Sequence, residues 1–152
     1  MSLVIDFKSE GDQLFVELNG RIDELSFLPP TDLWTCTQVI FDMEGLEGLS
    51  SEGIRRWLGW VTTFSKVKSI VRNCPKTVVD QMNALANFLP EGSKVESFFV
   101  PYYNEEKNTE RLVLFRSGTE FKASHVFAPS DIKGYNGAVS YTHLTLPTNR
   151  EV

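Results

Sequence analysis

The chain has 152 residues, of which 41% are hydrophobic and 23% are charged, and its formal net charge is −5. This length fits one domain of about 100–200 residues, and the acidic balance offers no basic surface to nucleic acid or to an anionic membrane. No apolar run approaches the roughly 18 residues of a membrane span, and the first residues lack the basic and apolar segments of a secretion signal. We therefore expect a cytoplasmic protein with neither a nucleic-acid nor a membrane partner.

Two short runs rich in β-forming residues open the chain and predict a hairpin. These runs are Leu3 to Phe7 and Leu14 to Leu18, and a polar stretch with one glycine separates them. An apolar stretch from Leu25 to Thr37 follows, and Pro29-Pro30 interrupts it. Because proline breaks a helix interior, this stretch predicts a loop or at most one helical turn.

The centre of the sequence predicts a buried strand and then a turn. Val39 to Phe41 is an unbroken apolar run bounded by turn residues, which is typical of a strand covered on both faces. We expect Asp42 to end this strand. Gly45 and Gly48 then favour a loose turn, since glycine adopts conformations that other residues avoid.

A helix is predicted directly after this turn. Its apolar positions recur with helical spacing along one stripe, and they are Ile54, Trp57, Leu58, Val61 and Phe64. Ser50 or Ser51 can cap the first turn through its hydroxyl, and Glu52 suits the positive end of the helix dipole. Hydroxyl groups therefore lie at a strand-to-helix turn, which makes this turn the chemical centre of the sequence.

The rest of the pattern predicts a strand, a second helix and further strands. The elements are a strand at Val67 to Val71, a helix from Asn73-Cys74-Pro75 to Pro90, a closing strand at Lys94 to Tyr103, and a hairpin of Arg111 to Phe115 with Phe121 to Phe127. We expect Asn73 or Cys74 to cap the second helix. Alternating strands and helices imply a βαβαβ core with parallel neighbours.

The C-terminal segment does not continue this pattern. Ala138 to Thr148 reads like one frame of a sequencing-library adaptor, so we exclude residues 138–152 from the fold. We expect a single domain over residues 1–128 with its core at 3–103, and an unstructured tail over 129–152.

The central segment resembles the STAS domain of bacterial anti-sigma factor antagonists and of sulfate transporters. The matching positions are Asp42, Gly45, Leu46, Leu49, Ser50, Ser51, Glu52, Gly53 and Ile54, and the Gly20 to Asp23 segment resembles the end of the family's second strand. The resemblance spans about Leu3 to Tyr103. It implies an α/β fold with a mixed sheet, helices mainly on one face and an N-terminal hairpin, to which the C-terminal hairpin is added.

The resemblance also implies a function in signalling and transcription regulation. In regulatory members, the serine at the position of Ser51 is phosphorylated by a partner kinase, and the residue before it is usually Asp; here that residue is Ser50, which is a second candidate acceptor. The resemblance thus implies a non-catalytic partner switch that binds an anti-sigma factor or serine kinase. A structural or ligand-sensing scaffold module without phosphorylation is the alternative.

The residues themselves leave two interpretations open at this helix. Ser50 and Ser51 either cap the helix only, or one of them is a phospho-acceptor or partner contact. Trp60 either packs under the loop of residues 25–34, or it joins Arg56 in an exposed patch of the types enriched at interfaces. Glu52 and Arg55 complete the candidate partner-binding set.

The sequence favours neither an enzyme nor a cofactor protein. A nucleophile elbow of the G-x-S-x-G type requires glycine at position 52, where Glu52 stands. A zinc site usually needs four ligands, and Cys36 and Cys74 could be joined only by His125 and His143. We therefore expect no catalytic residue, no metal and no cofactor.

Overall fold

The computed structural model describes residues 2–29, 36–64, 67–85, 87–90, 92–104, 106–119, 121–122 and 125–126. Strand β1 (Val4–Glu10) and strand β2 (Gln13–Ile22) pair antiparallel. Gly11 lies in their turn with a φ of 57°, a conformation that costs glycine little because it has no Cβ. The predicted N-terminal hairpin is confirmed, and both strands are longer than the apolar runs that predicted them.

Strand β3 (Gln38–Leu49) lies parallel to β2 and begins with the predicted apolar run. The prediction that Asp42 ends this strand, and that Gly45 and Gly48 form a turn, is wrong. Pairing with β2 continues to Leu49, with two irregularities in the register. Glycine tolerates such bulged pairing, so the strand bends at these positions and does not end.

The helices and strands that follow β3 keep the predicted order. They are α1 (Ser51–Val61), the 3₁₀ turn η1 (Thr62–Phe64), β4 (Lys68–Arg72) and α2 (Lys76–Ala84). Strand β4 is parallel to β3. The N-cap of α2 is Pro75, and not Asn73 or Cys74, because Asn73 has a left-handed φ of 56° and Cys74 bridges to Phe98.

The predicted closing strand is divided, and the predicted C-terminal hairpin is wrong in its pairing. The elements are β5 (Lys94–Val95), β6 (Ser97–Asn104), β7 (Thr109–Arg116), β8 (Phe121–Lys122) and β9 (His125–Val126). Strand β7 pairs antiparallel with β6, and β8 pairs with β9. Because β6 supplies a long partner that adjoins β7 in sequence, β7 forms its hairpin with β6 and not with the segment after it.

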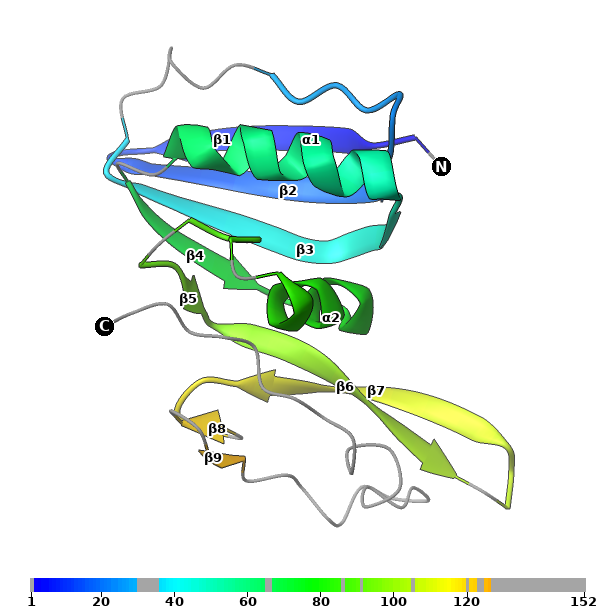
Figure 1. Cartoon of the computed structure of the whole chain (residues 1–152). Coiled ribbons are helices and arrows are strands. Elements are labelled where there is room, and N and C mark those ends of the chain that lie inside the picture. Colours follow the sequence, from blue (N-terminus) through cyan, green and yellow to red (C-terminus); the bar gives the residue numbers. More distant parts are fainter. Residues whose placement is uncertain are drawn as a thin grey trace.

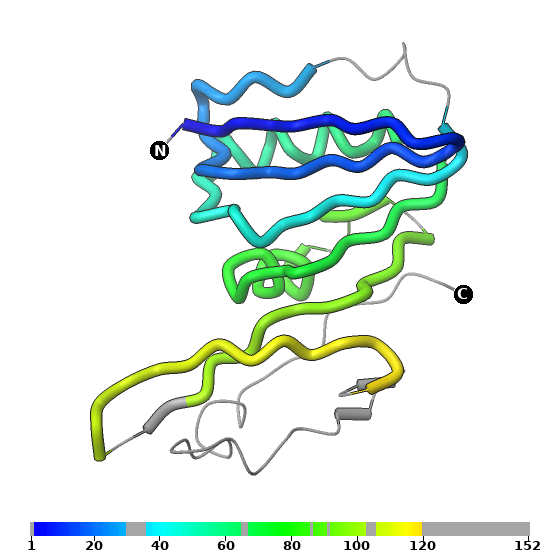
Figure 2. Tube along the Cα trace, turned by 180° about the vertical axis from the view of Figure 1, so that it is seen from behind, coloured from blue at the N-terminus to red at the C-terminus, as the bar shows by residue number. Residues whose placement is uncertain are grey.

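The described strands form one five-stranded mixed sheet and two small two-stranded sheets. The order in the large sheet is β1-β2-β3-β4-β5. Figure 1 shows α1 and α2 on one face of this sheet, and Figure 2 shows the strands of the other face from behind. The burial of β3 follows from this arrangement, since Val39 and Phe41 are fully buried whereas Ile40, predicted to be covered, is only half-buried on the open face.

The apolar stripe of the first helix meets the sheet as predicted. Trp57, Val61 and Phe64 are buried, while Ile54 and Leu58 are half-buried at the edge of the stripe. One hydrophobic cluster joins this stripe to strands β2 to β7. Burial of this apolar surface is the main force that holds α1 on the sheet.

Some predictions concern residues outside the described part of the chain. These are the tail at 129–152, with its adaptor-like segment 138–152, and the loop residues 30–35. Among the described helices, none is long and apolar enough to cross a membrane.

Candidate functional site: the start of helix α1

The end of β3 passes into α1 through Ser50, whose backbone is extended. The amide of Ser50 donates to the carbonyl of Ile22 at 3.0 Å, which ties the turn to the end of β2. Its hydroxyl oxygen accepts a hydrogen bond from the amide of Gly53 at 3.0 Å. Of the two predicted capping residues, the structure therefore has Ser50 as the N-cap, a role worth about 1 kcal/mol.

Gly53 brings the first turn of α1 against the backbone of β2. It is buried, and a Cβ at this position would lie closer than 3.0 Å to the carbonyl oxygen and carbon of Ile22 and to the amide nitrogen of Asp23. These are backbone atoms, which cannot rotate away as a flexible side chain can. Glycine is thus required for this close approach of helix and strand.

Ser51, the first residue of α1, has the opposite environment from Ser50. Its side chain is exposed, and its hydroxyl makes no hydrogen bond to a described residue. The first amides of a helix point along its axis and carry a partial positive charge there. The hydroxyl of Ser51 is therefore more accessible than that of Ser50, which is half-buried and engaged in the cap.

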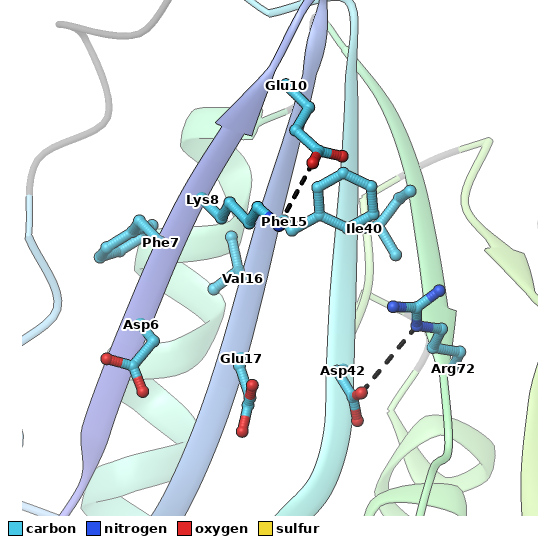
Figure 3. A pocket seen from close by; sticks show the side chains of 10 residues that line it. All are labelled: Asp6, Phe7, Lys8, Glu10, Phe15, Val16, Glu17, Ile40, Asp42 and Arg72. Atoms are coloured by element: carbon cyan, nitrogen blue, oxygen red, sulfur yellow. Dashed lines mark ion pairs between the residues drawn. The ribbon is translucent and has the colours of Figure 1, made fainter.

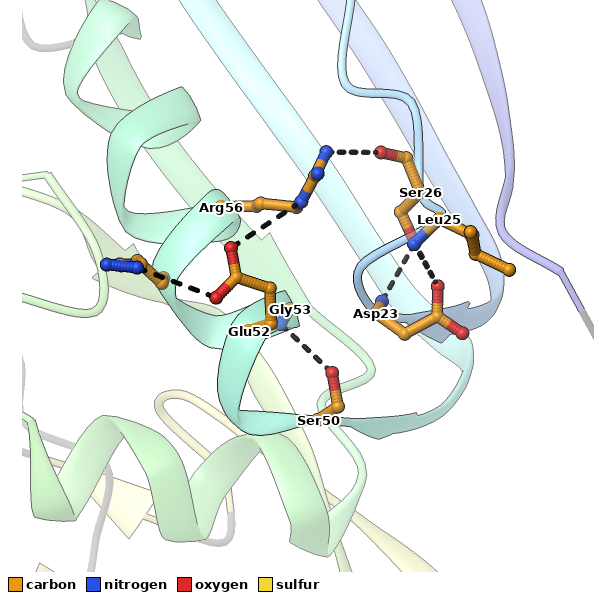
Figure 4. A network of polar contacts seen from close by, with 8 residues as sticks. Asp23, Leu25, Ser26, Ser50, Glu52, Gly53 and Arg56 are labelled. Atoms are coloured by element: carbon orange, nitrogen blue, oxygen red, sulfur yellow. Dashed lines mark hydrogen bonds and ion pairs between the residues drawn. The ribbon is translucent and has the colours of Figure 1, made fainter.

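Three charged side chains surround this helix start. Glu52 lies 3.6 Å from Arg55 and 4.0 Å from Arg56, measured between carboxylate oxygen and guanidinium nitrogen. Arg56 also donates through Nη1 to the carbonyl of Ser26 at 3.3 Å. Figure 4 shows that Arg56 thereby joins α1 to the loop after β2. The structure brings Ser51, Glu52, Arg55 and Arg56 together as predicted neighbours on one helix.

The loop after β2 is held in place by Ser26. The Ser26 hydroxyl accepts from the amide of Asp23 at 2.8 Å and donates to the carbonyl of Arg21 at 3.2 Å. The Asp23 carboxylate accepts from the amide of Leu25 at 2.9 Å. These bonds fix a tight turn, seen beside α1 in Figure 4.

This turn presents two large apolar side chains to solvent, and sequence reasoning missed them. Leu25 is 85% exposed and Phe27 is 76% exposed, although the chain has ample core in which to bury such residues. Both were expected only as part of an apolar loop. The sequence carries no signal for this exposure, because apolar residues that alternate with a serine are usually expected to point inward; here it is Ser26 that is buried.

Trp60 is not part of an exposed patch. Its side chain is only 6% exposed, and its indole nitrogen donates to the carbonyl of Pro29 at 2.6 Å. Its ring centroid lies 5.6 Å from that of Trp57 with an interplanar angle of 56°, and 6.1 Å from that of Phe41. Of the two interpretations, the structure supports the packed one, with a contact to Pro29 among the described residues of the loop, and Trp60 is removed from the set of accessible partner contacts.

The two cysteines do not contribute to this site. Cys74 is fully buried, and burial, together with the nearby Asp42 carboxylate, raises the pKa of its thiol. Partial burial also raises the pKa of Cys36. Both thiols therefore stay protonated at neutral pH, and no group of three or more His, Cys, Asp and Glu residues in the described ranges could hold a metal ion.

The architecture and the site define the class only coarsely. The protein is an α/β domain with a mixed sheet, two helices on one face, and a polar strand-to-helix turn beside exposed apolar side chains. No protein-family model and no curated protein matches the chain.

Proposed function

We propose that this chain is a non-catalytic regulatory module of the STAS type, which binds a protein partner over the start of α1 and releases it when Ser51 is phosphorylated. The observation that carries the proposal is the combination of an exposed serine at the start of α1 with two exposed apolar residues, Leu25 and Phe27, on the loop that Arg56 joins to α1. Exposed aromatic and aliphatic side chains on a rigid turn are suitable anchors for a protein interface. The partner expected from the resemblance is an anti-sigma factor or a serine kinase.

The charge of α1 supports a switch at Ser51. Helix α1 contains one acidic residue, Glu52, and two basic residues, Arg55 and Arg56, so its formal charge is −1 + 2 = +1. A phosphate on Ser51 adds about −1.5 to −2, so the sum becomes about −0.5 to −1. A partner that docks through an acidic surface is attracted in the first state and repelled in the second.

The fold tolerates the phosphate in this proposal. The group would meet the free amides and the positive dipole end of α1, which favour an anion at this position. Ser50 keeps its capping bond in both states, because that bond involves a different hydroxyl. Partner binding is therefore lost without unfolding.

The test combines phosphosite mapping in native cells with pull-downs of matched variants. We expect Ser51 to be the phosphorylated serine, and we expect Ser51→Asp and the pair Leu25→Ser with Phe27→Ser to lose the partner that wild type and Ser50→Ala retain. Leu112→Ser is the control, since Leu112 is a large apolar side chain that is 56% exposed on β7, away from α1. If neither serine is phosphorylated and Ser51→Asp recovers every wild-type partner, the switch is refuted.

The alternative is a structural or ligand-sensing scaffold module without phosphorylation. One observation favours it, namely a hollow of about 460 Å³ on the open face of the sheet. A small molecule could bind there, and neither Ser50 nor Ser51 lines the hollow. In that case, Ser50 and Ser51 matter only to helix stability. This alternative would be supported if Ser50 and Ser51 carry no phosphate in native cells and if the partners bind Ser51→Asp as well as they bind wild type.

A further inference from the structure

The open face of the five-stranded sheet carries a hollow that the switch does not use. Figure 3 shows it from the side opposite to α1, with Phe15 of β2 and Ile40 of β3 adjacent on its floor. These two residues are direct partners across the strands, and Ile70 of β4 is the next partner in the same row. All three are half-buried, and the Arg72 guanidinium lies over Phe15, 5.8 Å from the centroid of its ring. Part of the apolar surface therefore remains open here, although the helices cover the other face.

A row of carboxylates runs beside this apolar row. Asp6 of β1 lies opposite Glu17 of β2, and Glu17 lies opposite Asp42 of β3. Like charges directly opposite each other on neighbouring strands destabilise a sheet. The fold therefore bears a cost in stability at this row.

Only one end of the row is neutralised within the described part of the chain. Asp42 lies 3.9 Å from Arg72 and accepts from the side-chain amide of Asn73 at 3.2 Å. Asp6 and Glu17 have no cationic partner there. The lining of the hollow has four carboxylates against two cations, Lys8 and Arg72, so its formal charge is −2. Lys8 is paired with Glu10 at 3.2 Å, which leaves it less available to Asp6 and Glu17.

We propose that this hollow docks a basic amphipathic segment of a partner protein. Its cations would lie on Asp6 and Glu17, and its apolar side chains on Phe15 and Ile40 and on the adjoining Ile70, which pairs with Ile40 outside the lining of the hollow. Charge decides between occupants. A second copy of this chain would set one acidic row against another, and nucleic acid or an anionic membrane would be repelled. Neighbouring strands lie about 4.8 Å apart. The Cβ atoms of helical residues three or four positions apart lie roughly 5–6 Å from each other. Because these spacings are similar, successive cations along one helix can meet carboxylates on successive strands.

The experiment uses a synthetic amphipathic helix of Leu, Ala and Lys, with the same peptide carrying Glu in place of Lys as the control. Binding is measured by calorimetry, and the surface is mapped by backbone NMR shifts. We expect the Lys peptide to shift the amides of Phe15, Ile40 and Ile70. We also expect the double variant Asp6→Asn with Glu17→Gln to weaken binding about tenfold, as the loss of two charge pairs implies, and added salt to weaken wild-type binding.

Two further variants make the result specific. Asp80→Asn with Glu110→Gln removes two exposed carboxylates away from the hollow and should leave binding unchanged. Ser51→Asp should also bind the peptide as wild type does, so this proposal can fail or succeed independently of the switch. Asp6→Asn with Glu17→Gln should melt at a higher temperature than wild type, because it relieves the repulsion.

Four results would overturn the proposal. Two concern the ligand: the Glu peptide binds as tightly as the Lys peptide, or spermidine, a polycation without an apolar face, does so. Two concern the variants: Asp6→Asn with Glu17→Gln binds the Lys peptide as wild type does, or Asp80→Asn with Glu110→Gln weakens binding as much as Asp6→Asn with Glu17→Gln. A lower melting temperature of the Asp6→Asn and Glu17→Gln variant would also refute it, because it would show that the acidic row does not destabilise the fold.

Discussion

Replacing Gly53 by alanine is expected to destabilise the protein, although alanine is the better helix former. Alanine gains about 1 kcal/mol over glycine in a helix interior. At position 53, however, its Cβ would overlap backbone atoms of Ile22 and Asp23. Overpacking costs about 1–3 kcal/mol, and the upper end applies because backbone cannot move aside without shifting α1 from β2. The expected net loss in the free energy of unfolding is about 2 kcal/mol.

Gly59→Ala is the matched control on the same helix. Gly59 is exposed, and a Cβ there would meet nothing within 4 Å, so alanine should stabilise the protein by up to about 1 kcal/mol. Urea denaturation of both variants should therefore show them about 3 kcal/mol apart, on opposite sides of wild type. If Gly53→Ala gains stability as Gly59→Ala does, the close contact between α1 and β2 is not rigid, and the reasoning fails.

Three other predictions concern the cap, the buried thiol and the tail. Ser50→Ala should lower the free energy of unfolding by about 1 kcal/mol, whereas Ser51→Ala should change it by less than about 0.5 kcal/mol, as denaturation can show. Native Cys74 should resist a thiol reagent that modifies Cys36. Because the pKa of Cys74 is raised on folding, stability should fall as pH rises above the ordinary value of 9.0, where the unfolded thiol ionises first, and Cys74→Ala should lose that part of the slope. Truncation after Gly137 should move the melting temperature by less than about 2 °C, since the segment removed shows no core pattern.

The element order could be predicted from the sequence because each element carries its own period. The stripe through Trp57, Val61 and Phe64 has the helical spacing, and the runs around it alternate or are continuously apolar. The extent of β3 could not be predicted in the same way, because Gly45 and Gly48 are as typical of turns as of bulged strands. Only pairing with β2, a tertiary interaction, decides between these possibilities.

The candidate site was predicted in position but not in detail. The sequence located the hydroxyl groups at the start of α1, yet it could not assign the cap to Ser50, since that depends on the backbone angles of the turn. It left Trp60 open between core and surface because helical spacing puts it at the border of the stripe. The exposure of Leu25 and Phe27 depends on a turn that is fixed by hydrogen bonds among several residues of the loop, and these bonds cannot be deduced from composition. From their apolar character alone, both residues would be expected to be buried.

The contact between Trp57 and Trp60 gives the protein a built-in optical signal. Two indole rings this close, and inclined to each other by 56°, couple their electronic transitions and should produce an exciton couplet in far-ultraviolet circular dichroism. Both rings lie three residues apart on α1, so the couplet requires the helix itself as well as the packing of both rings against Phe41 of β3. The order of these two rings on the formed helix can therefore be followed in the unlabelled protein while ligands or partners are added.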